Sequence, residues 1–108
     1  MTATKPHRER LPNRRLGETF NFECSGLQYT CTVGRFADGR MAAVFLCNHK
    51  SNSAADTNAR DSAIVAWIAL QYSANIETIR RALCRDSHGR ASGPLGTALD
   101  RLAGDDAR

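Results

Sequence analysis

Apolar and polar residues alternate along the first half of the chain, which predicts β-strands with one buried face. Phe20, Phe22 and Cys24 alternate with polar residues, and a second alternating run covers residues 27–33. The third run, at 41–47, is nearly all apolar, which indicates a strand that is either central in the sheet or covered on both faces. Together the three runs predict an antiparallel meander.

Short polar turns separate the three predicted strands. Ser25 and Gly26 are expected to form a tight turn between the first two strands. Asp38 and Gly39 lie between the second and the third, and Asp-Gly between two β runs is typical of a type I′ turn. Because that turn needs a positive φ at both central residues, Gly39 is expected to have a positive φ.

The second half of the chain predicts helices. Residues 63–70 form an apolar run rich in alanine and free of glycine and proline, which favours a helix. Since the run is apolar nearly all round, the helix is expected to be central and buried, with Trp67 and Tyr72 in the core. Two further helices are predicted after it. Asn75 is expected to cap the first of these helices. Pro94 is expected to be the first residue of the second helix, and Gly104 its C-cap.

This order of elements predicts an α+β domain, in which an antiparallel three-stranded β-meander is followed by two to three helices packed on one face. A length of 108 residues fits one domain. We expect residues 1–13 to be a flexible basic arm, 14–104 to form the domain and 105–108 to fray. Neither a secretory leader nor a membrane-spanning run of about 18 apolar residues is readable, so we expect no membrane contact and a cytoplasmic location.

The net charge of +4 is concentrated at one end of the chain. Residues 1–15 carry five basic residues and one acidic residue, whereas the remainder carries ten of each. Four arginines of this segment are candidates for binding nucleic acid or a partner: Arg8, Arg10, Arg14 and Arg15. The alternative is a solubilising tail, because the segment lacks interleaved aromatic residues.

The polar segment before the long helix is a candidate anion-binding or nucleotide-binding site. A helix N-terminus offers free N–H groups and the positive end of a dipole, and phosphates suit such donors. The expected contacts are Lys50, Ser51, Asn52 and Ser53, with Arg40 of the hairpin as an additional donor. The alternative is an ordinary capped loop.

The four cysteines show no Cys-x-x-Cys spacing, so the common zinc signatures are missing. Three lie in predicted strands, where we expect reduced thiols that pack as small apolar side chains. Cys84 and His88 make a two-ligand combination that lacks a third ligand nearby. No P-loop, serine elbow or His-Glu-x-x-His motif is present, so we expect no metal, no cofactor and no catalytic residues.

The order of short motifs resembles the TSCPD domain, which closes many cobalamin-dependent (class II) ribonucleotide reductases and also occurs as small stand-alone proteins. The resemblance includes Asp38-Gly39-Arg40 and Ala91-Ser92-Gly93-Pro94-Leu95. The matching stretches are residues 11–15, 29–34, 38–40, 44–46, 49–53, 69–72 and 91–95. Where the eponymous motif has a cysteine this chain has Gly93, so a redox or metal role for that cysteine does not carry over.

The resemblance implies the context of ribonucleoside-diphosphate reduction but not catalysis, because those reductases hold the radical cysteine, the substrate and cobalamin in a large barrel domain. We therefore expect a non-catalytic accessory or regulatory module of deoxyribonucleotide metabolism. Its partner would be a ribonucleotide reductase or another protein, or a nucleotide. Two alternatives stay open: a small nucleic-acid-binding protein that uses its basic arm, and a thiol or metal protein. The choice between a monomer and a homo-oligomer also stays open.

Overall fold

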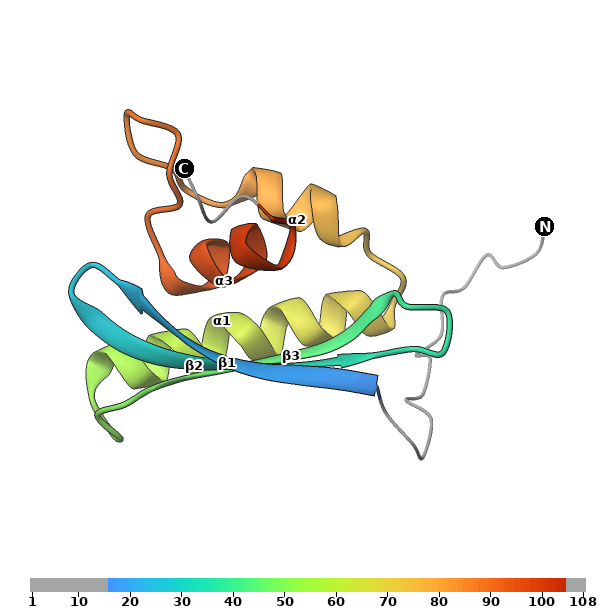
Figure 1. Ribbon diagram of the computed structural model, residues 1–108, viewed down its shortest axis with the longest axis horizontal. Helices are drawn as coiled ribbons and strands as arrows, with labels where there is room; N and C mark the ends of the chain where they lie inside the picture. The colour runs from blue at the N-terminus through green and yellow to red at the C-terminus, as the bar shows by residue number, and fades with distance from the viewer. Residues whose placement is uncertain (1–15, 105–108) are drawn as a thin grey trace.

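The computed structural model describes residues 16–104, in which three strands precede three helices (Figure 1). The elements are β1 (Leu16–Cys24), β2 (Leu27–Arg35), β3 (Met41–Asn48), α1 (Ala54–Gln71), α2 (Ile76–Ala82) and α3 (Pro94–Leu102). The strands form one antiparallel sheet in the order β1-β2-β3. The predicted α+β fold class is therefore confirmed. The expected arm at 1–13 and tail at 105–108 lie outside the described residues.

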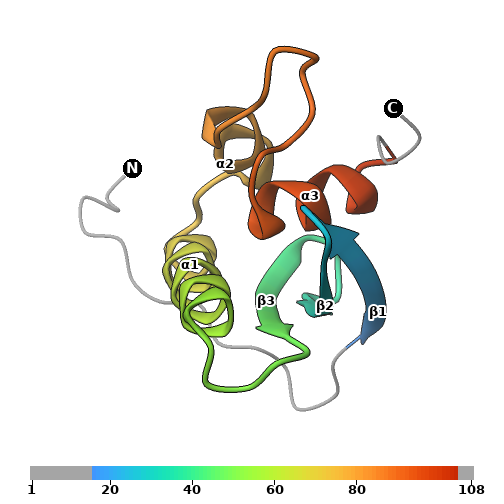
Figure 2. The same ribbon diagram turned by 90° about the vertical axis from the view of Figure 1, so that its left-hand side faces the viewer.

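The two faces of the sheet differ in polarity, as the alternation along β1 and β2 predicts. Phe22, Tyr29 and Cys31 lie on one face and are buried in a core that also contains Leu95 and Leu99 of α3. The opposite face carries hydroxyl and amide groups that pair across the strands. These pairs are Thr19–Thr32, at 3.2 Å between hydroxyl oxygens, and Thr30–Asn21, at 2.7 Å. The helices leave this polar face uncovered (Figure 2).

The two hairpin turns differ from each other. Ser25 and Gly26 have φ values of 54° and 81°, which is the two-residue turn with two positive φ angles. Gly39 has the predicted positive φ of 93°, but Asp38 does not, so the type I′ prediction is wrong at this turn. Two backbone hydrogen bonds of 2.9 Å within residues 36–40 instead close a three-residue loop, in which a glycine in the left-handed region follows a type I turn.

β3 is an edge strand, so of the two expected arrangements, central in the sheet or covered on both faces, the central one is excluded. Helix α1 runs alongside it and covers this edge (Figure 2). The four residues 41–44 are buried in succession. A register shift contributes to this, because Gly34 pairs with Ala43 while Arg35 pairs with Met41, and the strict alternation of β3 is broken there.

Residues 63–70 of α1 are apolar nearly all round, yet only one face of the helix is buried. The buried apolar residues are Ala59, Ala63, Ala66 and Leu70. Larger side chains point outward and are 45% to 68% exposed: Ile64, Val65, Ile68 and Tyr72. The prediction of a helix buried on all sides is therefore wrong, and so is the core position of Tyr72. Alanine faces the sheet because its small side chain lets the helix approach β3 closely.

The ends of the later helices form as predicted. The side-chain oxygen of Asn75 accepts hydrogen bonds from the N–H groups of Glu77 at 2.8 Å and Thr78 at 3.3 Å, which caps α2. Pro94 begins α3, and Gly104 follows its last turn with a φ of 87°. No helix within residues 16–104 has the length and apolar content needed to cross a membrane.

The alanine face of α1 gives the first testable prediction. Ala63 is 1% exposed, so Ala63→Leu should lower the free energy of unfolding by about 2 kcal/mol, because the added atoms force α1 away from β3. Ile68 is 45% exposed, and Ile68→Asp should cost no more than about 1 kcal/mol. Urea denaturation measures both values, and the reverse order of stabilities would contradict this description of α1.

Candidate binding sites

The predicted anion site lies between β3 and α1, where Ser53 caps the helix. Its hydroxyl accepts a hydrogen bond from the N–H of Asp56 at 3.1 Å and donates one to the carbonyl oxygen of Lys50 at 2.7 Å. The structure therefore uses Ser53 for capping. Lys50, Ser51 and Asn52 are exposed beside it, and their side chains remain available to a ligand.

Asp56 occupies the inner side of this loop, which sequence reasoning missed. Its carboxylate accepts hydrogen bonds from the backbone N–H groups of Asn48 at 2.9 Å and Asn52 at 3.3 Å, and from Nε of Arg60 at 3.0 Å. The N–H of Asn48, above all, holds the pKa of Asp56 below its usual range. The signal in the sequence was an aspartate three residues after a capping serine, a common helix start.

Arg40 lies at the opposite end of β3 from this loop. β3 has eight residues, so roughly 25 Å separate the two ends at about 3.3 Å per residue. Nε of Arg40 is 2.7 Å from the carboxylate of Asp38, and its guanidinium lies 4.6 Å from the centre of the Phe36 ring. The structure thus brings Lys50, Ser51, Asn52 and Ser53 together but does not bring Arg40 to them.

The four cysteines are free thiols in different surroundings. Cys24 and Cys31 are buried, Cys47 is partly buried and Cys84 is exposed. Burial, with a smaller contribution from the charge of Glu18, raises the pKa of Cys31 to about 12. Within residues 16–104 no three His, Cys, Asp or Glu side chains are grouped so that they could hold a metal ion. The candidate arginines Arg8, Arg10, Arg14 and Arg15 lie outside the described residues.

An arginine–carboxylate cluster joins α2, the following loop and α3. Arg85 donates to both carboxylate oxygens of Asp100 at 2.7 Å, and Arg80 donates to the same group at 2.9 Å. Arg80 also pairs with Glu77 at 2.9 Å. The hydrogen bonds from Arg85, followed by those from Arg80, hold the pKa of Asp100 below its usual range. Because Asp100 is 15 residues from Arg85 and 20 residues from Arg80, no local pattern in the sequence predicts this cluster.

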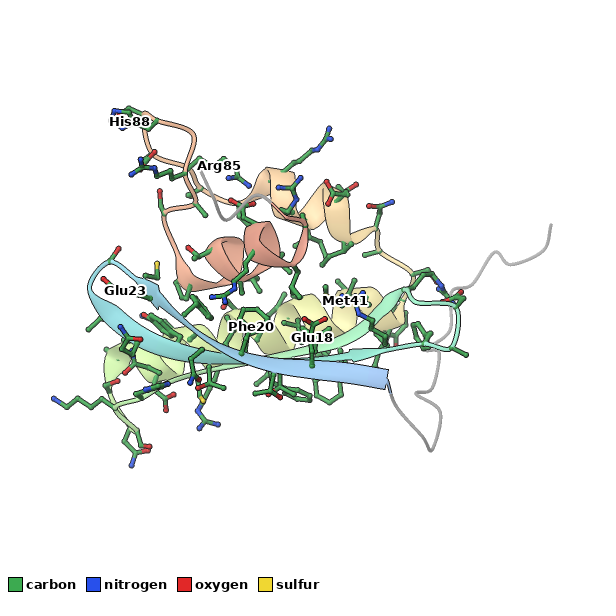
Figure 3. The ribbon with its side chains drawn as sticks, in the orientation of Figure 1. Glu18, Phe20, Glu23, Met41, Arg85 and His88 are labelled. Carbon is green, nitrogen blue, oxygen red and sulfur yellow. The ribbon has the colours of Figure 1, made fainter. Side chains whose placement is uncertain are left out.

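The segment between α2 and α3, predicted as a polar loop, contains a second closed turn. The carboxylate of Asp86 accepts hydrogen bonds from the N–H groups of His88 at 2.8 Å and Arg90 at 3.0 Å. Arg85 and Ala91 form a β-bridge at its base. Figure 3 shows His88 at the tip of this projection, directed away from the rest of the protein. The backbone bonds within 86–90 repeat those within 36–40.

An apolar surface covers the outer side of α1 and continues toward the uncovered face of the sheet. We call Ile64, Val65, Ile68 and Tyr72 the α1 outer face. A groove of about 360 Å³ adjoins it and is lined in part by Phe45, Trp67 and Ile64. The rings of Phe45 and Trp67 meet edge to face, with 4.9 Å between their centres. Within residues 16–104 the buried N–H of the Trp67 indole has no acceptor.

The chain is similar to part of a much longer enzyme. Over 70 residues, which are 65% of this chain, it is 36% identical to the vitamin B12-dependent ribonucleotide reductase of Agrobacterium fabrum (strain C58). The chain is related to a region of that reductase. It spans about 6% of the length of the relative. No family model and no solved structure matches the chain.

The carboxylate of Asp100 predicts a specific dependence of stability on pH. Because its pKa is lowered in the folded protein, its ion pairs contribute fully above the ordinary value of about 3.9 and are lost as the pH falls through the lowered pKa. Asp100→Asn should cost about 2 kcal/mol at pH 7 and flatten the loss of stability below pH 4. Urea denaturation at several pH values tests this, with the exposed Asp61→Asn as the control. Equal slopes in Asp100→Asn and in the unmodified protein would contradict it.

Proposed function

We propose that the chain is a non-catalytic accessory or regulatory module of deoxyribonucleotide metabolism that contacts the body of a ribonucleotide reductase. The observation that carries the proposal is the similarity to a small region of a vitamin B12-dependent ribonucleotide reductase. The motif order supports a TSCPD domain as the type of module.

The α1 outer face is the proposed contact surface. In the relative, the matching region is part of a far longer chain. A region that packs against the rest of such a chain needs a surface that favours protein contact. Four large apolar side chains, three on α1 and that of Tyr72 at its C-cap, provide such a surface, since contiguous exposed apolar patches commonly mark protein interfaces.

The groove beside this face adds shape to the proposed interface. Phe45 and Trp67 form one wall, and aromatic side chains are enriched at the centres of protein interfaces. Arg60 lines the same groove with a side chain that is 57% exposed. The partner surface is therefore expected to insert an apolar side chain here, beside a carboxylate or a carbonyl group.

The proposal predicts that charge on the α1 outer face abolishes binding. Val65→Asp combined with Ile68→Asp should weaken binding to the catalytic chain of a B12-dependent ribonucleotide reductase from the same cell at least tenfold, because burying an unpaired carboxylate is costly. Biolayer interferometry with both purified proteins measures the change. Thermal unfolding should show that the double variant remains folded.

The matched control adds the same two charges elsewhere. Thr78→Asp combined with Ser87→Asp places two carboxylates at exposed positions of α2 and of the loop after it, and this variant should bind as the unmodified chain does. If the double variant binds as tightly as the control, the α1 outer face is not the interface. If the unmodified chain does not bind the reductase at micromolar concentrations, the accessory role fails.

A nucleotide contact at the loop before α1 is a second part of the proposal. Lys50, Ser51 and Asn52 are exposed at the positive end of the α1 dipole. The negative charge of Asp56 beside them is offset by its bond with Arg60. Arg40 is not part of this site because it lies at the far end of β3.

A titration with inorganic phosphate tests the loop. If it binds, amide NMR shifts should appear in residues 48–56, and Lys50→Ala should weaken these shifts several-fold, since charge-assisted hydrogen bonds are about twice as strong as neutral ones. Arg40→Ala should leave the affinity unchanged. No shift in this segment at millimolar phosphate would remove the nucleotide contact and leave the protein contact as the function.

The alternative function, nucleic-acid binding, rests on Arg8, Arg10, Arg14 and Arg15. These residues carry much of the net charge of the chain. Binding to DNA or RNA that weakens steeply with salt and disappears on deletion of residues 1–15 would favour this alternative. The same deletion should leave binding to the reductase unchanged if the α1 outer face is the interface.

A further inference from the structure

A cleft of about 680 Å³ lies between the β1–β2 hairpin and the segment that runs from α2 to α3. Cys24 and Ser25 line it on the hairpin side. Figure 3 shows Glu23 and Arg85 on opposite sides of this space. Its volume is in the usual range for small-molecule sites. None of the residues proposed above for the α1 outer face or for the loop before α1 lines it.

The cleft carries an excess of positive charge, although the rest of the described chain is close to neutral. Five arginines line it: Arg80, Arg81, Arg85, Arg90 and Arg101. Three carboxylates, those of Glu23, Asp86 and Asp100, also line it, which leaves an excess of two positive charges. These arginines come from α2, the following loop and α3, so the fold gathers them from three separate segments.

Two of the arginines that line the cleft are held in place by ion pairs. Arg85 is held by both oxygens of Asp100, and Arg80 is shared between Asp100 and Glu77. Arg101 is positioned by the carbonyl oxygen of Asn21 at 3.0 Å. Guanidinium groups that are held in place lose little freedom when a ligand binds, which favours affinity.

The other two arginines, Arg81 and Arg90, are exposed to solvent. Arg81 is 78% exposed, and its one ion pair within the described part of the chain is with Glu77, at 3.6 Å. Within residues 16–104, Arg90 is exposed and its side chain makes no hydrogen bond or ion pair. Its backbone N–H is held by Asp86, so the closed turn directs this residue to the rim of the cleft. A ligand that meets both would gain two charge-assisted contacts.

We propose that this cleft binds a short polyphosphate chain, either free or carried by a nucleotide. Arginine forks match the geometry of phosphate oxygens, and arginines from several segments suit a ligand with several charges in a row. Phe22 is the aromatic residue in the lining, and it is 6% exposed and stacked on Tyr29. Since its ring offers no open face, Phe22 cannot stack on a base, and the phosphates provide the contacts that define the site.

Calorimetric titration of the full-length chain with tripolyphosphate, ATP and inorganic phosphate tests the proposal. Tripolyphosphate should bind more tightly than inorganic phosphate, and added salt should weaken it. Arg81→Gln and Arg90→Gln should each weaken tripolyphosphate binding roughly five- to tenfold. The matched control is Arg40→Gln, which removes the same charge at the other end of the sheet and should leave the affinity unchanged.

The comparison of ligands identifies the source of the phosphates. Equal affinity for tripolyphosphate and ATP would assign the site to the phosphate chain alone, whereas tighter binding of ATP that is still weakened by Arg90→Gln would assign it to nucleotides. No binding at millimolar concentrations would overturn the proposal. So would binding that Arg81→Gln and Arg90→Gln leave intact, or binding that Lys50→Ala abolishes.

Discussion

The close contact between α1 and β3 is the constraint on which the arrangement of the domain depends. Ala59, Ala63 and Ala66 present the smallest available side chains to the edge of the sheet, so the helix lies directly against the strand. The contact covers the unpaired edge of β3, which would otherwise be open to pairing with another chain. It also sets the direction of every other side chain on α1, and the largest of them face outward.

The sequence predicted the strands and helices well because their signals are local. Alternation along β1 and β2, the cap at Asn75 and the proline at position 94 each act within a few residues. The predicted burial of α1 on all sides was wrong, because an apolar run indicates how much of a helix can be buried but not which of its faces packs against the sheet. Alanine and isoleucine count alike in such a pattern, although their sizes decide which of them can face β3.

The candidate sites were predicted less well, because most of their contacts join distant parts of the chain. The loop from Lys50 to Ser53 was found through the helix start, a local signal, but Arg40 was added to it without knowledge of which hairpin lies at which end of the sheet. Asp100 bonds to residues 15 and 20 positions away, and this spacing has no periodicity to detect. The groove at Phe45 and Trp67 likewise exists only after β3 and α1 are packed together.

The way α2 is attached has a consequence for its motion. None of its residues is fully buried, and the carboxylate of Asp100 provides much of its connection to α3 through Arg80. Its apolar side chains Ile76 and Ile79 pack against the core but are only partly buried. A segment without fully buried side chains opens locally at a lower free energy than a core strand, so its amides should exchange with solvent before those of β2. Because α2 also lines the arginine-rich cleft, opening of α2 and occupancy of the cleft are thermodynamically linked. A ligand that binds only the closed form would slow exchange in α2, and conversely any contact that orders α2 would tighten the cleft.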